Sequence, residues 1–214
     1  MKIEVNKISN VELLRKCASF TSGKNSKMSL LTAYRNKHSI IRSQLFVIEM
    51  TDIPLFCASQ FVRSTQGVNW YQRTKRTDRG GEDFCKVCNS LADDLTTAWN
   101  NEDMDAHGDA TCEVRTLSDR FDRYTPTSLC AIMNAEAIIN MSEKRLCSMA
   151  SRDTREIWGQ VIREVAELDP DLAKFCVRPC VSHGGICRES KCCGYNKTTI
   201  GMREINNYKK IFEI

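Results

Sequence analysis

The 214-residue sequence lacks any apolar run long enough to cross a membrane, and it lacks internal repeats and low-complexity linkers. A membrane-spanning helix needs roughly 18 or more apolar residues. The residues that follow Met1 are mixed polar rather than the apolar segment of a secretory signal. We therefore expect a soluble, cytoplasmic protein (host cytoplasm if phage-encoded) without a membrane partner.

The sequence also lacks a strong excess of charge of one sign. Its 31 Lys and Arg residues face 27 Asp and Glu residues, for a net charge of +4. A balance this even gives no pronounced basic face, so binding to a nucleic-acid polymer is not expected. Apolar residues make up 42% and charged residues 27%, as in an ordinary globular protein rather than a disordered chain.

Length and periodicity predict one α+β domain over residues 1–214, helix-rich, with a small central sheet. The only clear strand is the short run of strand-forming residues at 44–50. Capping residues and apolar periodicity predict helices over 10–20, 27–37, 52–63, 83–100, 127–150 and 151–166, with a short one that starts at 169–170. A basic loop over 63–79 and an acidic connector over 101–109 separate them.

Twelve cysteines are many for a chain in which no secretory signal is visible, and a disulfide framework is not expected in the cytoplasm. Several crowd a cysteine-rich C-terminal segment, residues 176–195. Four thiolates at short spacing can hold zinc, whereas packing as small apolar side chains is the simpler alternative. The candidate ligands are Cys176, Cys180, Cys187 and Cys192, with His183 as a spare, and a separate C-x-x-C pair, Cys85 and Cys88, is followed by Cys112.

The segment from Arg63 to Arg79 combines Arg and Lys with hydroxyl side chains and two aromatic rings, Trp70 and Tyr71. Guanidinium groups hold phosphate with paired hydrogen bonds, and planar ligand rings stack on aromatic faces. The segment thus suits a phosphorylated, ring-containing ligand, although a solvated surface loop has the same composition.

Two further polar groups flank this segment in the sequence. His38 precedes the strand, and on local grounds it is a surface or capping residue. Asn134, Asn140, Lys144 and Arg145 lie on the long predicted helix, where Asn140 follows Ile138 and Ile139 and is expected to be partly buried.

These three segments, in this order, resemble the flavin-dependent thymidylate synthases over roughly residues 27–195. The family signature is Arg-His-Arg, seven residues, then Ser and, two residues later, Arg. Here Arg63-Ser64-Thr65 is followed by eight residues and Thr74-Lys75-Arg76. His38 matches the upstream histidine and Gln60 the glutamine before the signature. The helix residues Asn134, Asn140 and Arg145 match the downstream motif, and Gly67, Val68, Arg76, Asp78, Arg79 and the cysteine-bearing tail match a divergent phage-type branch.

The resemblance implies methylation of dUMP to dTMP with FAD as cofactor, NADPH as reductant and methylenetetrahydrofolate as one-carbon donor. It implies a homotetramer whose active sites combine residues of several subunits. The implied catalytic residues are Thr74, Arg76 and Arg145; the implied cofactor-binding residues are His38, Arg63, Ser64, Thr65, Asn134 and Asn140; and the implied substrate-binding residues are Gln60, Gln72, Arg73, Thr74, Arg76 and Arg145.

The sequence departs from the family pattern at several positions. Ser64 and Thr65 replace the signature His and second Arg, Glu136 stands where many members carry Arg, and Gln72 is the nearest match to an acidic loop residue. Two alternatives therefore stay open. One is a flavin- and folate-dependent deoxypyrimidine nucleotide hydroxymethylase, in which water traps the methylene group. The other is a non-catalytic nucleotide- or zinc-binding protein of the same fold.

Overall fold

The computed structural model describes residues 1–73, 93, 96–97, 100–101 and 123–212. Thr74 and Arg76 lie outside the described residues, as do Cys85, Cys88 and Cys112. So do most of the helix predicted over 83–100 and all but the first residue of the connector predicted over 101–109. No described helix is long and apolar enough to span a membrane.

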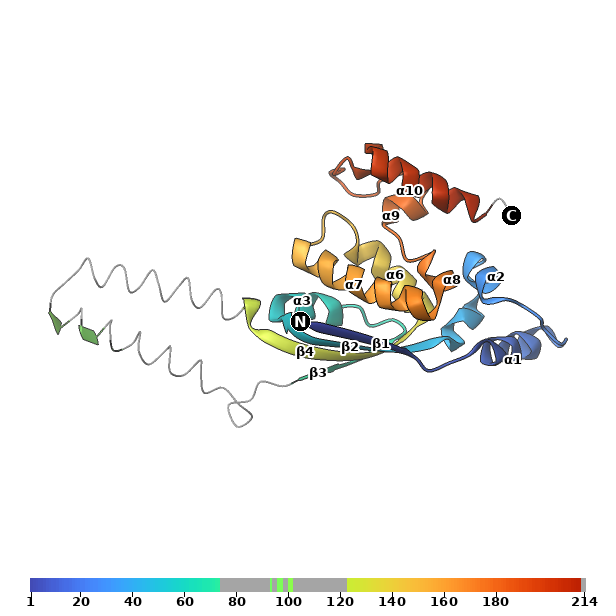
Figure 1. Ribbon diagram of the computed structural model, residues 1–214, viewed down its shortest axis with the longest axis horizontal. Coiled ribbons are helices and arrows are strands. Elements are labelled where there is room, and N and C mark those ends of the chain that lie inside the picture. Colours follow the sequence, from blue (N-terminus) through green and yellow to red (C-terminus); the bar gives the residue numbers. More distant parts are fainter. Residues whose placement is uncertain (74–92, 94–95, 98–99, 102–122, 213–214) are drawn as a thin grey trace.

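A four-stranded antiparallel sheet lies at the centre, in the order β1-β2-β4-β3. Figure 1 shows helices α3, α6 and α7 on one face of this sheet, with α9 and α10 beyond them. The strands are β1 (Lys2–Lys7), β2 (Leu45–Pro54), β3 (Val68–Gln72) and β4 (Pro126–Asn134). The helices are α1 (Val11–Ser22), α2 (Leu30–Arg35), η1 (Ser39–Ser43), α3 (Leu55–Val62), α6 (Ala135–Arg145), α7 (Arg152–Leu168), α8 (Pro170–Ala173), α9 (Pro179–Ser182), η3 (Tyr195–Lys197) and α10 (Thr199–Lys210).

Most of the helices predicted from caps and apolar spacing are confirmed. The side chain of Asn10 caps α1, and that of Ser151 caps α7 by accepting a hydrogen bond from Thr154. The predicted strand at 44–50 is β2 and extends four residues further, to Pro54, so that α3 begins just after this proline. The fold class, helices with a small central sheet, is as expected, and the sheet is antiparallel.

The prediction of one long helix over 127–150 is wrong. Its first part is strand β4, in which residues alternate between buried and half-buried, with Leu129, Ala131 and Met133 facing the core. Apolar residues four apart, such as Leu129 and Met133, fit both a helical and a strand period, so the spacing alone did not separate them. The helix proper, α6, begins only after Asn134.

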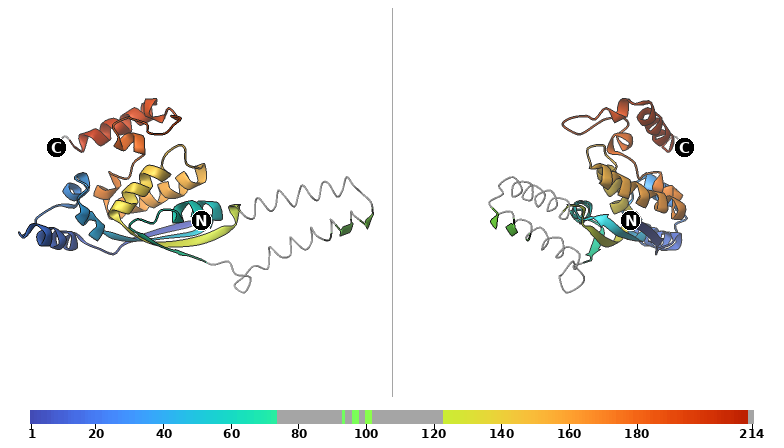
Figure 2. Two further views of the ribbon diagram at one scale, coloured as in Figure 1. Left: turned by 180° about the vertical axis from the view of Figure 1, so that it is seen from behind. Right: turned by 60° about the vertical axis from the view of Figure 1, so that its left-hand side comes forward.

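The basic loop predicted from Arg63 is also partly wrong, because Val68–Gln72 forms strand β3 and pairs with β4. This strand carries only one buried residue, Val68, and therefore shows little apolar alternation. Strand β1 and helix α10 were missed as well. Figure 2 shows α10 as an outer layer that packs over α9 rather than over the sheet.

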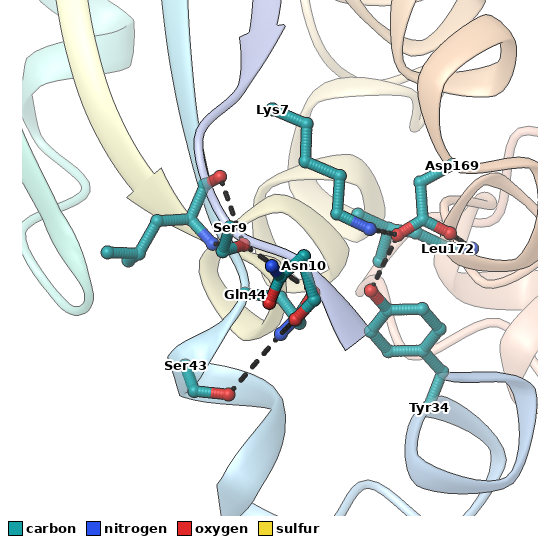
Figure 3. Close-up of polar contacts among 9 residues, drawn as sticks. Lys7, Ser9, Asn10, Tyr34, Ser43, Gln44, Asp169 and Leu172 are labelled. Carbon is teal, nitrogen blue, oxygen red and sulfur yellow. Dashed lines mark hydrogen bonds and ion pairs between the residues drawn. The ribbon is translucent and has the colours of Figure 1, made fainter. Parts of the chain in front are cut away.

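A buried carboxylate ties three parts of the fold together (Figure 3). Asp169, 2% exposed, accepts hydrogen bonds through Oδ2 from Lys7 Nζ at 2.6 Å and from Tyr34 Oη at 2.7 Å. Its Oδ1 accepts from the backbone N–H of Leu172 at 3.0 Å and so caps α8. Because a buried charge is costly unless it is paired, this set fixes β1 and α2 against the α7–α8 corner.

A second polar group holds the start of β2 (Figure 3). The fully buried Gln44 donates through Nε2 to the carbonyl of Asn10 at 3.0 Å, and Ser9 Oγ accepts from the backbone N–H of Leu45 at 2.8 Å. The carbonyl of Gln44 accepts from the N–H of Ala135, at the start of α6, at 2.9 Å. The beginning of α6 is thereby fixed to the sheet, which matters for the site described next.

Candidate active site

The turn between α3 and β3 brings its backbone directly against Asn134, the last residue of β4 and the N-cap of α6. Gly67 has a φ of 72°, and its carbonyl accepts a hydrogen bond from the N–H of Asn134 at 3.0 Å. A Cβ on Gly67 would lie 2.5 Å from Asn134 Nδ2. Both the positive φ and this close approach require glycine. Asn134 Oδ1 accepts from the N–H of Ala137 at 2.9 Å, so this predicted cofactor-binding side chain caps α6.

Trp70 fixes the same turn from the strand side. Its indole N–H donates to the carbonyl of Ser64 at 2.7 Å, and its ring stacks on Phe61 with centroids 6.5 Å apart. We expected Trp70 as a stacking surface for a ligand ring, but one of its faces packs on the core and its N–H is used. Tyr71, in contrast, is 57% exposed.

A cavity of about 350 Å³ lies between this turn, β4 and α6. Four predicted residues line it: Arg63, Ser64 and Thr65 from the turn, and Asn140 from α6. Asn140 is exposed rather than partly buried as expected, because it faces away from the core side of α6 that Ile138 and Ile139 occupy. The turn residue Gln66 and the α6 residues Ala137, Met141, Glu143 and Lys144 complete most of the lining; the resemblance gave none of these a role. Their spacing along one helix is the signal that could have found the α6 members.

Arg145 lies close to this cavity but does not line it. Its guanidinium donates to the carbonyl of Gln60, and its Nε is buried with no hydrogen-bond partner among the described residues. Burial, and then repulsion from the nearby Arg63, lowers the pKa of Arg145 from its ordinary value. Two guanidinium groups are thus held near each other, an arrangement that an anion would stabilise.

Positive charge at the cavity is in excess. Among the described residues, no carboxylate forms an ion pair with Arg63, Lys144 or Arg145. The acidic residues of α6 have cations of their own. Glu143 lies 3.9 Å from Lys37 Nζ, and Glu136 accepts from Arg42 Nε at 2.6 Å.

His38 lies on the segment that supplies these two cations. Its imidazole is exposed, and it precedes η1 without capping it through the side chain. Because Lys37 contacts Glu143 and η1 packs on α6, His38 lies on the α6 side of the cavity, outside its lining.

Gln60 of α3 does not line the cavity, and its side chain contacts α7 instead. Its Oε1 accepts a hydrogen bond from Thr154 Oγ1 at 3.1 Å, and its backbone carbonyl accepts one from the guanidinium of Arg145. Gln60 therefore helps to orient this guanidinium. Gln72 and Arg73 lie at the far end of β3, where the N–H of Arg73 donates to the carbonyl of Ser128 at 2.9 Å. At about 3.3 Å per residue, Gln72 lies roughly 13 Å along the strand from Val68, which lines the cavity. These two predicted substrate-binding residues are therefore outside it.

The candidate zinc ligands of the sequence do not come together as proposed. Cys176 is buried and donates to the carbonyl of Leu172, whereas Cys192 is exposed beside Asn196. In the part of the chain that the structure describes, no three His, Cys, Asp or Glu side chains stand at the spacing of a metal site.

No protein-family model matches the chain. No curated protein is similar to it in sequence. Solved structures do share its fold. A flavin-dependent thymidylate synthase, ThyX from Helicobacter pylori complexed with FAD and dUMP, matches with a TM-score of 0.56 and 9% identity, over 83% of this chain and all of that one. A UMP/dUMP methylase, PolB from Streptomyces cacaoi bound with 5-Br dUMP, matches with a TM-score of 0.48 and 14% identity, over 83% of this chain and 98% of that one. At 9% identity the likeness to the thymidylate synthase establishes the fold alone: the chain has the fold of the flavin-dependent thymidylate synthases.

Proposed function

We propose that the protein is a pyrimidine nucleotide one-carbon transferase that methylates dUMP to dTMP, with FAD as cofactor and with NADPH and methylenetetrahydrofolate as co-substrates. The fold of an enzyme whose solved structure carries FAD and dUMP supports the class of ligand. The sequence resemblance around Arg63, Asn140 and Arg145 supports the same chemistry from independent residues.

The observation that carries the proposal is the group of three cations at one cavity with no carboxylate partner among the described residues. Arg63 and Lys144 line the cavity, and Arg145 lies outside its lining but close enough to Arg63 for the two guanidinium groups to repel each other. Cations held together repel one another, and an oxyanion such as a nucleotide phosphate relieves that repulsion through charge-assisted hydrogen bonds. Hydroxyl groups from Ser64 and Thr65 add neutral donors and acceptors beside them.

The donor set fits an anionic, ring-containing ligand, and the cavity volume limits how much of one it can hold. A volume of about 350 Å³ is near the lower end for small-molecule sites, so it suits one nucleotide or one end of a dinucleotide. In our proposal Arg63, Ser64, Thr65 and Asn140 hold the flavin cofactor at this cavity, and Lys144 and Arg145 supply positive charge to the nucleotide. A bound flavin provides the hydride chemistry, while these residues bind and orient.

The assembly is part of the proposal. A homotetramer would place residues of other subunits around this cavity. Strand β3 is an edge of the described sheet and carries the exposed Tyr71, which is compatible with a neighbour at this edge. Light scattering coupled to gel filtration measures the assembly directly.

Binding measurements on matched lysine variants test the charge argument. Lys144→Gln removes a cation from the cavity, and Lys16→Gln removes one from an exposed position on α1. Loss of one charge-assisted hydrogen bond, about 1.5–3 kcal/mol, corresponds to a roughly 10- to 150-fold weaker dUMP affinity for Lys144→Gln. Lys16→Gln should bind as the unaltered protein does. Equal affinities in both variants, measured by calorimetry with FAD present, would remove Lys144 from the site.

The identity of the product decides between methylation and hydroxymethylation. Incubation with FAD, dUMP, methylenetetrahydrofolate and NADPH, followed by mass spectrometry of the nucleotide, distinguishes products that differ by one oxygen atom. The methyl product supports the proposal. A hydroxymethyl product supports the hydroxymethylase, and unchanged dUMP together with retained dUMP binding supports a non-catalytic nucleotide-binding protein.

A further inference from the structure

The segment that follows α9 forms a loop that brings two thiols into contact. Cys187 and Cys192 are separated by four exposed polar residues, 188–191. Glycines lie at both ends of this loop, and Gly185 and Gly194 have φ angles of 105° and 80°, conformations that allow tight turns. Among the side chains that act on the Cys187 thiol, that of Cys192 acts most strongly, through a hydrogen bond between the two.

Asn196 holds the two ends of the loop together. Its Nδ2 donates to the carbonyl of Gly185 at 2.7 Å, and its Oδ1 accepts from the Cys192 thiol at 3.5 Å. Cys192 Sγ also accepts from the N–H of Gly194 at 3.4 Å. One side chain therefore ties the backbone just before Cys187 to the thiol of Cys192. The contact between the two thiols is thus fixed by hydrogen bonds of the loop itself.

The two thiols are accessible and are placed for oxidation to a disulfide. Cys192 is exposed and Cys187 is half-buried, whereas Cys176 and Cys180 are buried. Thiols that already touch need only rotate to reach the S–S bond length of about 2.05 Å. The N–H of Gly194 also favours the thiolate at Cys192, which is the form that attacks a disulfide.

We infer that Cys187 and Cys192 form a reversible dithiol–disulfide pair that exchanges with low-molecular-weight disulfides such as glutathione disulfide. The Cys192 thiolate attacks one sulfur of the small disulfide and displaces the first thiol, which leaves a mixed disulfide on Cys192. The Cys187 thiolate then attacks Cys192 Sγ, forms the intramolecular bond and displaces the second thiol. The pair is oxidised, and the small disulfide takes up its electrons and protons and is released as thiols.

The exposure of this pair fits a reversible role. A permanent disulfide framework is not expected in a reducing compartment, where the disulfides that do form are mostly transient. Exposed disulfides are reduced more readily than buried structural ones. The loop that contains Cys187 and Cys192 therefore suits a bond that forms and opens with the redox state of its surroundings.

Closing the loop strengthens the hold of this segment on the end of α6. Tyr195 follows the loop, and the guanidinium of Arg178 lies over its ring, 4.0 Å from the centroid. Arg178 also donates to the carbonyl of Leu146, the C-cap residue of α6, at 2.7 Å. A disulfide restricts the opened loop far more than the folded one. The oxidised segment should therefore open less often, and Tyr195 should stay on Arg178.

Peptide mapping of the full chain tests whether the disulfide forms. The protein is equilibrated with glutathione disulfide, alkylated and digested with trypsin, which cleaves after Arg188 and Lys191 inside the loop. Residues 175–188 and 192–197 then remain joined only where a disulfide links them. We expect this joined peptide from the unaltered protein, and we expect excess reduced glutathione to separate it.

Serine variants test which cysteines are paired. The joined peptide should fall to below about a tenth in Cys187→Ser and in Cys192→Ser. It should persist in Cys193→Ser and in Cys180→Ser, which lie on the same two peptides. Adjacent Cys192 and Cys193, both exposed, make a matched pair. If a variant does not fold, fragmentation of the joined peptide from the unaltered protein assigns the bonded cysteines directly.

Amide hydrogen exchange tests the effect on the segment. Amides of residues 194–197 should exchange roughly tenfold more slowly in the oxidised than in the reduced unaltered protein, and equally in both conditions in Cys192→Ser. Equal exchange in the unaltered protein would overturn the stronger hold on α6.

Three outcomes would overturn the pairing: no joined peptide from the unaltered protein, a joined peptide that reduced glutathione does not separate, or one that is lost in Cys193→Ser but kept in Cys192→Ser. The loop shares no residue with the cavity at Arg63. Since flavin and dUMP binding are measured at that cavity, failure here leaves the proposed function unaffected.

Discussion

Replacing Gly67 with alanine should damage both the fold and the site, by an amount that a second glycine allows us to separate into its causes. Gly67 and Gly23 both have positive φ, 72° and 66°. An alanine in this region costs about 1–2 kcal/mol at either position. At Gly23 the new Cβ meets nothing within 4 Å, so the loss of stability in Gly23→Ala measures only the cost of holding alanine at a positive φ. At Gly67 it would lie 2.5 Å from Asn134 Nδ2.

Relief of that clash moves the Asn134 side chain away from the N-terminus of α6. Loss of the cap costs about 1 kcal/mol, and loss of the hydrogen bond between the N–H of Asn134 and the carbonyl of Gly67 costs about 1 kcal/mol more. Gly67→Ala should therefore be about 2 kcal/mol less stable than Gly23→Ala. For a chain of this length that corresponds to a Tm lower by roughly 4–8 °C.

Thermal unfolding of the two variants, followed by circular dichroism, gives the comparison directly. Calorimetric titration with dUMP in the presence of FAD then reports the site, because the turn that carries Gly67 also carries Arg63, Ser64 and Thr65. We expect weaker dUMP binding in Gly67→Ala and unchanged binding in Gly23→Ala. Equal Tm values for the two variants would refute the close approach of Gly67 to Asn134 as the source of the constraint.

Three further substitutions test the surroundings. Trp70→Phe keeps an aromatic ring on Phe61 but removes the hydrogen bond to the carbonyl of Ser64. It should lower the free energy of unfolding in guanidinium by about 1 kcal/mol and weaken dUMP binding. Unchanged binding would mean that the turn holds its shape without this hydrogen bond. Asp169→Ala leaves Lys7, whose side chain is 13% exposed, without its ion-pair partner and should cost about 3–5 kcal/mol, which Lys7→Met in the same chain should partly restore. Burial, and then Asp169, raises the pKa of Tyr34 well above its ordinary value of about 10, so the folded state disfavours its ionisation and stability falls as the pH rises past about 10. Unfolding midpoints at pH 8 and about 10.5 should therefore differ less in Tyr34→Phe.

Much of the helical part of the fold could be predicted from sequence because its signals are local. Asn10 and Ser151 cap α1 and α7 at the positions the sequence indicates. The sheet was harder, because β1 and β3 form through pairing with β2 and β4, which no local pattern reports. In β4 an apolar spacing of four, Leu129 to Met133, suited a helix equally well until its strand partners were known.

The residues of the candidate site were likewise only partly predictable from the sequence. Sequence reasoning named Arg63, Ser64, Thr65 and Asn140, which the structure brings to one cavity. It placed Gln72 and Arg73 in a loop, whereas β3 carries them along a strand and away from that cavity. The resemblance gave no role to Lys144 or Glu143, although they share a face of α6 with Asn140, because its motif does not include them. Which residues face a cavity is decided by tertiary packing, and a motif aligned by spacing cannot supply it.

Many flavin-dependent thymidylate synthases carry arginine at the position of the acidic residue Glu136. The effect of this difference on the charge of the site depends on the residues that surround Glu136 in the fold. Taken alone, Glu136 reverses the charge beside the expected phosphate site. In the structure it forms two hydrogen bonds with Arg42, and Glu143, two turns further along the same face, is near Lys37. Exposed pairs of this kind contribute little to stability, about 0–1 kcal/mol. Their effect at the site is electrostatic: each acid is offset by a cation from the segment before β2, so the excess positive charge of Arg63, Lys144 and Arg145 remains. The substitution of arginine by Glu136 therefore does not by itself argue against binding of an anionic nucleotide.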